Sequence, residues 1–211
     1  MKAVIIAGGV PPSLDLIMNE LQGDCVLICA DSGANCLLEY KINPDYLIGD
    51  FDSIDEKALM YFSSRNCVIE EHPSEKDETD SELALIKAIE LKPDQIALLG
   101  CTGNRLDHTF GNLGLLMKCL NTKIQAYIRD EKNTMWLANK SLSIYGKTDE
   151  YFSLLAYGSD VSNISIRGAK YSLNNYHLKL GSSLTVSNRF IDSKVEISFS
   201  DGILLITKSF D

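Results

Sequence analysis

The chain has 211 residues, of which 45% are hydrophobic, and a formal net charge of -9 at pH 7. A chain of this length can bury one large domain or two small ones without disulfides. The acidic charge argues against a nucleic-acid partner, because phosphate backbones are bound by clustered Lys and Arg. An anionic substrate would therefore need metal ions between itself and the protein.

The cysteines and the start of the chain indicate a compartment. The six cysteines precede residue 120, lie mostly in apolar runs and form no C-x-x-C pattern, so we interpret them as reduced core residues. The chain starts with Met1-Lys2 and then an apolar run, which does not resemble a signal peptide. No apolar run approaches the ~20 residues that a membrane-spanning helix needs. We expect a cytoplasmic protein with no membrane partner.

The first half of the chain alternates short apolar runs with helical patterns. This alternation is typical of βαβ units and a mostly parallel sheet. The apolar runs, which we interpret as strands, cover residues 3–7, 25–30, 46–48, 67–70 and 95–99.

Helical patterns stop in the stretch 122–140, and β-forming segments follow between turn residues. These segments cover residues 142–145, 152–157, 161–166, 176–180, 183–187, 194–199 and 203–207. We therefore expect an α/β protein: an N-terminal, mostly parallel, Rossmann-like α/β sandwich domain over residues 1–139, and a small C-terminal antiparallel β-sandwich over residues 140–211.

Three acidic, glycine-bearing segments follow predicted strands in the first half. They are Gly49–Ser53, Lys76–Asp80 and Thr102–His108. Strand ends at one edge of an open α/β sheet form the crevice where ligands bind, so these segments should converge on one site. Clustered carboxylates beside a phosphate-sized gap indicate Mg²⁺ and a nucleotide.

In the first segment, Asp50 and Asp52 should project together. Alternate residues of an extended chain point the same way. Two carboxylates on one side suit Mg²⁺, which takes one or two carboxylates plus substrate phosphates. The alternative is an acidic turn in which Ser53 caps a helix that starts near Ile54.

In the second segment, Thr79 and Glu82 have the spacing of a capping box before an amphipathic helix. Capping does not explain Lys76 or Asp77. Asp80 could complement the positive N-terminus of the helix. It could equally supply a metal ligand or a general base, and the segment alone leaves these readings open.

In the third segment, the loop that contains Thr102 and Gly103 can bring backbone N–H groups to phosphate oxygens, and Arg105 can neutralise them. Asp107 and His108 stand at the start of the next helix, where a lone His is more often a capping or packing group than a catalyst. That helix is predicted to bury an apolar face made of Leu106, Phe110, Leu113, Met117 and Leu120.

Taken in order, these segments resemble the thiamine pyrophosphokinases, also called thiamine diphosphokinases. The resemblance rests on Asp31–Ala34, Gly49–Ser53, Lys76–Asp80, Thr102–His108 and Leu184–Asn188. It implies that residues 1–139 bind ATP and Mg²⁺, that residues 140–211 bind thiamine, and that a homodimer holds thiamine between its subunits. The implied reaction transfers the diphosphoryl group of ATP to the hydroxyl of thiamine, giving thiamine diphosphate and AMP.

The resemblance also implies residue roles. It assigns Asp50, Asp52 and Asp80 to Mg²⁺ and, together with Arg105, to catalysis. Ser187 and Asn188 would reach thiamine. The implied ATP site is a larger set: Asp31, Ser32, Gly33, Ser53, Lys76, Asp77, Thr79, Thr102, Gly103, Asp107 and His108.

The chain departs from the family pattern at two positions. Asn104 stands where the family commonly has a second Gly, which should be tolerated because Asn visits left-handed conformations more readily than most residues. Some members stack a Trp from the last strand on thiamine, whereas this chain has Ile203 or a neighbour there and its one Trp is Trp136. The aromatic part of a thiamine pocket is left open.

The residue types suit the implied chemistry. The alcohol of thiamine must attack the β-phosphorus of ATP in line, so charge must be neutralised at the transferring group and at the leaving oxygen. Asp80 is a candidate base for the alcohol proton, and a mechanism without a dedicated base stays equally open. Two other functions stay open as well: a non-catalytic nucleotide or thiamine sensor, and a kinase that transfers the γ-phosphoryl group.

Overall fold

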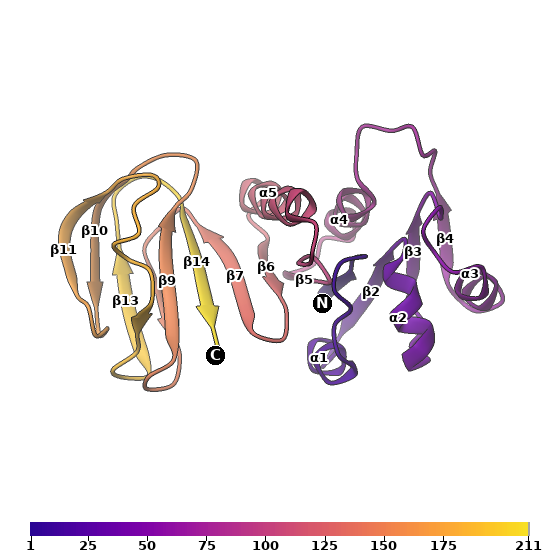
Figure 1. Ribbon diagram of the computed structural model, residues 1–211, viewed down its shortest axis with the longest axis horizontal. Helices are drawn as coiled ribbons and strands as arrows, with labels where there is room; N and C mark the ends of the chain where they lie inside the picture. The colour runs from indigo at the N-terminus through magenta and orange to yellow at the C-terminus, as the bar shows by residue number, and fades with distance from the viewer. Residues whose placement is uncertain (211) are drawn as a thin grey trace. The chain divides into compact units, whose positions relative to one another are not determined.

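The computed structural model describes residues 1–210, and they form two compact units. Unit 1 covers Met1–Glu131 and unit 2 begins at Lys132. Figure 1 shows that all helices belong to unit 1, whereas unit 2 is built from strands. Within residues 1–210, no helix is both long and apolar enough to cross a membrane.

Strands and helices alternate along unit 1, as the sequence predicts. The strands are β1 (Lys2–Ile6), β2 (Cys25–Ala30), β3 (Tyr46–Gly49), β4 (Val68–Glu71), β5 (Gln95–Leu99) and β6 (Gln125–Arg129). The helices are α1 (Leu14–Glu20), α2 (Gly33–Tyr40), α3 (Glu56–Ser63), α4 (Asp80–Glu90) and α5 (Leu106–Thr122). The first five strands lie where the apolar runs predict them. The sixth lies in the stretch where we predicted no strand.

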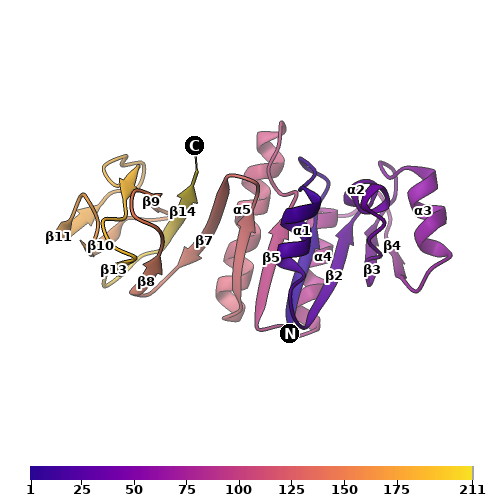
Figure 2. The ribbon, with the colours of Figure 1, turned by 90° about the horizontal axis from the view of Figure 1, so that it is seen from below.

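The sheet of unit 1 reverses its strand order at one place. Its strands are parallel, in the order β6-β5-β1-β2-β3-β4. The chain moves outward from β1 to β4 and then returns to place β5 on the other side of β1. Figures 1 and 2 show α1, α2 and α3 on one face of this sheet and α4 and α5 on the other. Ligands of such sheets bind at the carboxyl ends of the strands beside the reversal.

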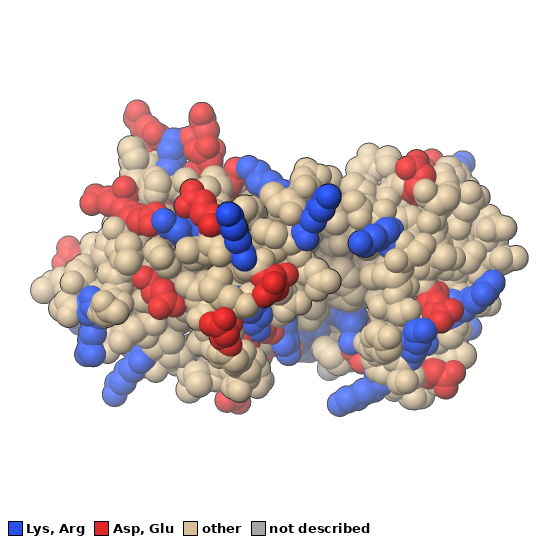
Figure 3. Space-filling view, turned by 180° about the vertical axis from the view of Figure 1, so that it is seen from behind, with Lys and Arg blue, Asp and Glu red and all other residues tan. Residues whose placement is uncertain are grey.

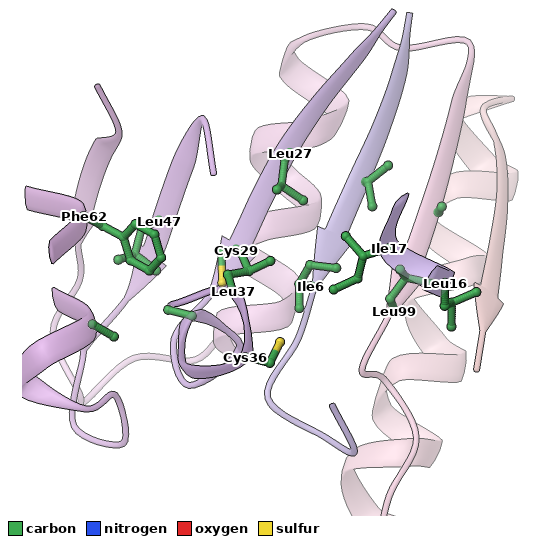
Figure 4. Close-up of a cluster of buried hydrophobic side chains, with 14 residues drawn as sticks. Ile6, Leu16, Ile17, Leu27, Cys29, Cys36, Leu37, Leu47, Phe62 and Leu99 are labelled. Atoms are coloured by element: carbon green, nitrogen blue, oxygen red, sulfur yellow. The ribbon is translucent and has the colours of Figure 1, made fainter. Parts of the chain in front are cut away.

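A core between the sheet and the first three helices fixes these strand ends. Its side chains come from the middle of the sheet and from all three helices (Figure 4). They include Ile6, Leu27, Leu47 and Leu99 from the strands and Ile17, Leu37 and Phe62 from the helices. Because helices cover both faces of a parallel sheet, its central strands are apolar throughout and show no alternation.

The six cysteines are free thiols, four of them buried. Burial raises the pKa of Cys36 and of Cys67 to about 11. Thiols with such pKa values carry little thiolate at neutral pH and are weak nucleophiles. This placement agrees with the prediction of reduced, largely buried cysteines.

The predicted apolar face of the last helix is wrong. The buried residues of α5 are Asn112, Leu115, Leu116 and Cys119, which are spaced as one helical stripe. Leu106 and Phe110 are 64% and 66% exposed. The prediction placed the stripe from the first turn onward, whereas that turn is exposed and its His108 and Thr109 line the ligand site described below.

Unit 2 is a sandwich of two antiparallel layers, as predicted. One layer has the strand order β12-β9-β14-β7 and the other β11-β10-β13-β8. A shared core includes Phe152, Ile166 and Ile206. The strands are β7 (Asn133–Ala138), β8 (Leu142–Tyr145), β9 (Tyr151–Ala156), β10 (Val161–Arg167), β11 (Leu173–Leu178), β12 (Asn188–Arg189), β13 (Lys194–Ser198) and β14 (Leu204–Ser209).

One predicted strand of unit 2, residues 183–187, is a turn. The N–H of Val186 donates to the carbonyl of Ser183 at 3.1 Å, and Ser187 has a left-handed φ of 59°. Neither feature belongs to an extended strand. Pairing with β9 begins only at Asn188.

Glu20, near the end of α1, is a buried carboxylate held by three donors. It lies 2.8 Å from Nζ of Lys2 and 2.5 Å from Nη1 of Arg129, and it accepts a hydrogen bond from the hydroxyl of Tyr127. Burial raises the pKa of Glu20, but the hydrogen bonds from these donors outweigh it, so the pKa lies below its ordinary value.

We expect Glu20→Gln to destabilise the protein by about 3 kcal/mol at pH 7, because the neutral amide loses the charge-assisted hydrogen bonds that the buried carboxylate accepts from Lys2, Tyr127 and Arg129. A carboxylate with a lowered folded-state pKa stabilises the fold above its unfolded-state pKa, and this contribution is lost as the pH falls through the folded pKa. The difference from wild type should therefore shrink below about pH 4. Urea unfolding at pH 7 and pH 3 measures it, with the exposed Glu39→Gln as control. An equal difference at both pH values would contradict this account.

Candidate active site

A cavity of about 810 Å³ lies at the carboxyl ends of the parallel strands in unit 1. Its volume is typical of small-molecule sites. It is lined by residues that follow each of β1 to β5 and by the first turns of α5. It thus occupies the place where the strand order reverses.

The floor of the cavity is formed by β1 and β5, which keep pairing beyond their ends. The N–H of Gly9 donates to the carbonyl of Gly100 at 2.7 Å, and the N–H of Val10 donates to that of Thr102 at 2.8 Å. A Cβ on Gly9 would overlap both of these carbonyl oxygens. Gly100 has a φ of 65°, which only glycine adopts without cost. The close approach of the two segments therefore requires glycine.

Three carboxylates gather at one end of this cavity. One oxygen each from Asp31, Asp50 and Asp52 lies within 4.8 Å of the other two. Oxygens on opposite sides of a Mg²⁺ ion are about 4.2 Å apart, given Mg–O distances of 2.0–2.1 Å. Small side-chain movements would bring all three carboxylates to one ion.

Asp31 supplies an independent sign that this cluster holds a cation. It is 6% exposed, and its Oδ2 accepts a hydrogen bond from the hydroxyl of Ser53. Its Oδ1 is buried without a hydrogen-bond partner among the described residues. A buried carboxylate oxygen left in this way is costly unless a cation or ordered water satisfies it.

The structure excludes one alternative that the sequence left open, namely that Ser53 caps a helix. Ser53 does not cap a helix near Ile54, because α3 starts at Glu56 with Asp55 as its N-cap. Ser53 instead donates to Asp31. The residue expected as a possible cap thus orients a carboxylate of the cluster.

Asp50 and Asp52 differ in their electrostatic environment. The N–H of Asp52 donates to Oδ1 of Asp50 at 3.2 Å and, together with Lys76, lowers the pKa of Asp50. The charge of Asp50 raises the pKa of Asp52. A cation between the two carboxylates would relieve this repulsion, which favours binding there.

Lys76 separates Asp80 from the cluster. Its Nζ lies 3.2 Å from Oδ2 of Asp50 and 3.1 Å from Oδ1 of Asp80. We predicted Asp80 beside Asp50 and Asp52 around a metal. In this structure Asp80 faces Lys76, and the residue that completes the cluster is Asp31.

The loop between β4 and α4 carries the remaining residues of the second segment. Figure 3 shows Asp and Glu side chains gathered over this projecting loop. Thr79 caps α4 as predicted, since its Oγ1 accepts from the N–H of Glu82 at 3.3 Å. The side chain of Glu82 pairs with Lys118 instead of returning to Thr79.

The third segment places its basic and acidic side chains against each other. Nη2 of Arg105 lies 2.6 Å from Oδ2 of Asp107, and both side chains are exposed. His108 is exposed as well, with Nε2 4.0 Å from the same carboxylate. Arg105 and His108 line the cavity with Thr102 and Gly103.

Most residues predicted for the nucleotide site converge on the cavity. Three lie outside its lining: Gly33, Asp77 and Asp107. Gly33 has a structural reason, since a Cβ there would come within 2.6 Å of the carbonyl oxygen of Ile6.

Sequence reasoning missed Asn112, a buried amide of α5 that lines the cavity. Its Nδ2 donates to the carbonyl of Cys101 at 2.9 Å and so holds the loop after β5. Thr102 is held in turn, because its Oγ1 donates to Asp130 at 3.1 Å. The available signal was a polar residue inside the apolar stripe of a helix.

In unit 2, the two residues predicted to reach thiamine differ in exposure. Ser187 is exposed, and its N–H donates to Oγ of Ser153 at 3.0 Å. Asn188 is 3% exposed. Its amide pairs with the backbone of Tyr171, at 3.0 Å to the N–H and 2.8 Å to the carbonyl. Asn188 therefore holds the loop in place, and Ser187 is the one that faces outward.

Comparisons with protein families match both units. The family model described as "Thiamin pyrophosphokinase, catalytic domain" matches residues 17–128. The model described as "Thiamin pyrophosphokinase, vitamin B1 binding domain" matches residues 140–204.

Individual relatives match over the whole chain. The chain is 35% identical to thiamine pyrophosphokinase of Bacillus subtilis, with 100% of each chain covered. The crystal structure of the Bacillus subtilis protein superposes with a TM-score of 0.91 at 34% identity, covering 100% of both chains. That of thiamin pyrophosphokinase from Geobacillus thermodenitrificans gives 0.87 at 33% identity, covering 100% of this chain and 98% of the other.

Proposed function

The chain belongs to the thiamine pyrophosphokinase family and transfers a diphosphoryl group to thiamine, and we propose that its donor is ATP, bound with Mg²⁺ in the cavity of unit 1. The observation that carries this proposal is the buried, unpartnered Oδ1 of Asp31 beside Asp50 and Asp52. Such an oxygen-rich cluster at the reversal of strand order fits a metal-bound polyphosphate.

The cluster of Asp31, Asp50 and Asp52 would hold the metal, and Asp80 adjoins it across Lys76. When bound, Mg²⁺ neutralises charge on the transferring group and on the oxygen of the leaving AMP. Ser53 keeps the carboxylate of Asp31 in position. This protein therefore contributes mainly by placing charge, which suits the loose transition state of phosphoryl transfer.

The far end of the cavity would hold the rest of the polyphosphate. The backbone of Thr102 and Gly103 precedes the N-terminus of α5, whose N–H groups and dipole favour anions. Arg105 is exposed and pairs only with Asp107 among the described residues, so its guanidinium can turn from that carboxylate to a phosphate. Asn112 keeps the loop in position through Cys101.

We assign thiamine to unit 2, where residues 140–204 match a vitamin B1 binding domain. Ser187 is the predicted contact that lies exposed, while Asn188 shapes its loop. Thiamine is a cation, so the acidic character of the chain favours its approach. Asp80 remains a candidate base for its hydroxyl proton, alongside a mechanism without a base.

We also propose a cytoplasmic homodimer that holds thiamine between its subunits. Exposed apolar side chains on the loop before Ser187 support an interface there: Leu180, Leu184 and Val186. The free thiols suit a reducing compartment. Light scattering of the purified protein tests the assembly, and a monomer mass at micromolar concentration would contradict it.

The nucleotide product tests the proposed donor chemistry. Incubation with ATP, Mg²⁺ and thiamine should give AMP and thiamine diphosphate in equal amounts. ADP with thiamine monophosphate would indicate γ-phosphoryl transfer instead. Binding of both substrates without turnover would indicate a sensor.

A further inference from the structure

The side chain of Lys76 places a positive charge among the carboxylates of the candidate site. Its Nζ lies between two carboxylates, 3.2 Å from Asp50 and 3.1 Å from Asp80, and its side chain is 12% exposed. Burial lowers its pKa, but the hydrogen bonds that the ammonium donates to Asp80 and Asp50 outweigh this effect, so the pKa of Lys76 is raised above its ordinary value. The ammonium of Lys76 is thus a counterion for Asp50 and Asp80 that the chain itself supplies.

This counterion competes directly with a metal for Asp50. Oδ1 of Asp50 accepts the N–H of Asp52, and Oδ2 faces Lys76. A divalent cation and an ammonium a few ångströms apart repel each other strongly in a partly buried site. While Lys76 stays in place, a metal can share Asp50 with Lys76 only against this repulsion, and Asp80 is paired with the ammonium.

We propose that Lys76 gates this site: its ammonium holds Asp50 and Asp80 until nucleotide phosphates draw it away, and only then does Asp80 become available to the metal. Lys76 lines the same cavity that would hold the phosphates, and its flexible four-carbon chain allows the movement. The inference rests on the proposed function, and makes Lys76 a positioning residue that couples nucleotide and metal binding.

The test measures the affinities for a metal and for a nucleotide, which should change in opposite directions when Lys76 is replaced. In Lys76→Met, the dissociation constant for Mn²⁺ without nucleotide should fall about tenfold, because a repelling charge is gone. The dissociation constant for α,β-methylene-ATP, measured in EDTA, should rise about tenfold, because a phosphate partner is gone. Electron paramagnetic resonance of free Mn²⁺ and calorimetry give the two values on the full chain.

Two further variants separate gating from a general structural effect. Lys76→Arg keeps the charge and should stay within a few-fold of wild type in both assays. Lys87→Met removes an equally acid-paired lysine that lies outside the cavity lining, 2.5 Å from Glu70, and should change neither affinity. Circular dichroism confirms that each variant is folded.

The possible outcomes distinguish this inference from the proposed function. Mn²⁺ binding that is unchanged or weaker in folded Lys76→Met, while wild type binds both ligands, would overturn the gate alone. Wild type that binds neither Mn²⁺ nor the nucleotide would overturn the proposed function and the gate together.

Discussion

Replacing Asp52 by Asn is expected to lower turnover by about 10²–10³-fold while leaving the protein folded, on the scale of losing one key electrostatic contact. Asn keeps the size of the side chain but loses the charge that completes the cluster with Asp31 and Asp50. The fold should tolerate the change, because Asp52 is exposed and its charge is repelled by Asp50. Steady-state formation of AMP and the melting temperature measure the two effects.

Asp55→Asn is the matched control for this change. Asp55 lies three residues further on and is the N-cap of α3, but its side chain makes no capping hydrogen bond. It lies outside the cavity lining. Activity within a few-fold of wild type is expected. Wild-type turnover in Asp52→Asn, or an equal loss in both variants, would remove Asp52 from the metal site.

The part of the fold that sequence predicts well is the part that local pattern determines. The central strands of unit 1 are buried on both faces, so each appears as a nearly uninterrupted apolar run, such as residues 96–99 of β5. Thr79 caps its helix through contacts within one turn. Such features depend on neighbours in the chain and can be read from it.

The features that sequence missed depend on tertiary contacts. The strands β6 and β7 lie in the stretch where the helical pattern ends, and their residues are largely half-buried, so neither a continuous apolar run nor a strict alternation marks them. Phe110 is exposed because the start of α5 borders the open cavity instead of the core, which the periodicity of the helix does not encode.

The candidate site shows the same division. That acidic segments after β3, β4 and β5 meet at one cavity follows from the parallel topology. Which carboxylates share one position does not, because it depends on side-chain directions across three strands. Asp31 joins Asp50 and Asp52, and Lys76 intervenes before Asp80. The segment alone left the role of Asp80 open and the resemblance assigned it to the metal, but neither says which way the side chains of Lys76 and Asp80 turn.

Gly9→Ala is expected to lower turnover 100-fold or more, because it displaces the backbone segments that form the floor of the cavity. A single methyl group would overlap the carbonyl oxygens of Gly100 and Thr102, so β1 and β5 must separate where Gly9 now donates to Gly100 at 2.7 Å. Such overpacking costs about 1–3 kcal/mol of stability. The same separation moves Thr102 and Gly103, so nucleotide affinity should fall with turnover. Calorimetry with α,β-methylene-ATP and urea unfolding measure both.

Gly114→Ala separates this steric effect from the mere loss of a glycine. A Cβ at Gly114, in the middle of α5, would meet no atom within 4 Å beyond its chain neighbours and the backbone of its own helix, and Ala is favoured over Gly in a helix by about 1 kcal/mol. This variant should therefore be equally or more stable than wild type and fully active. If Gly9→Ala were also stable and active, the strand ends could not form a rigid floor. The carboxylate cluster, which rests on the neighbouring strand ends, would then have to position its ligand without support from β1 and β5.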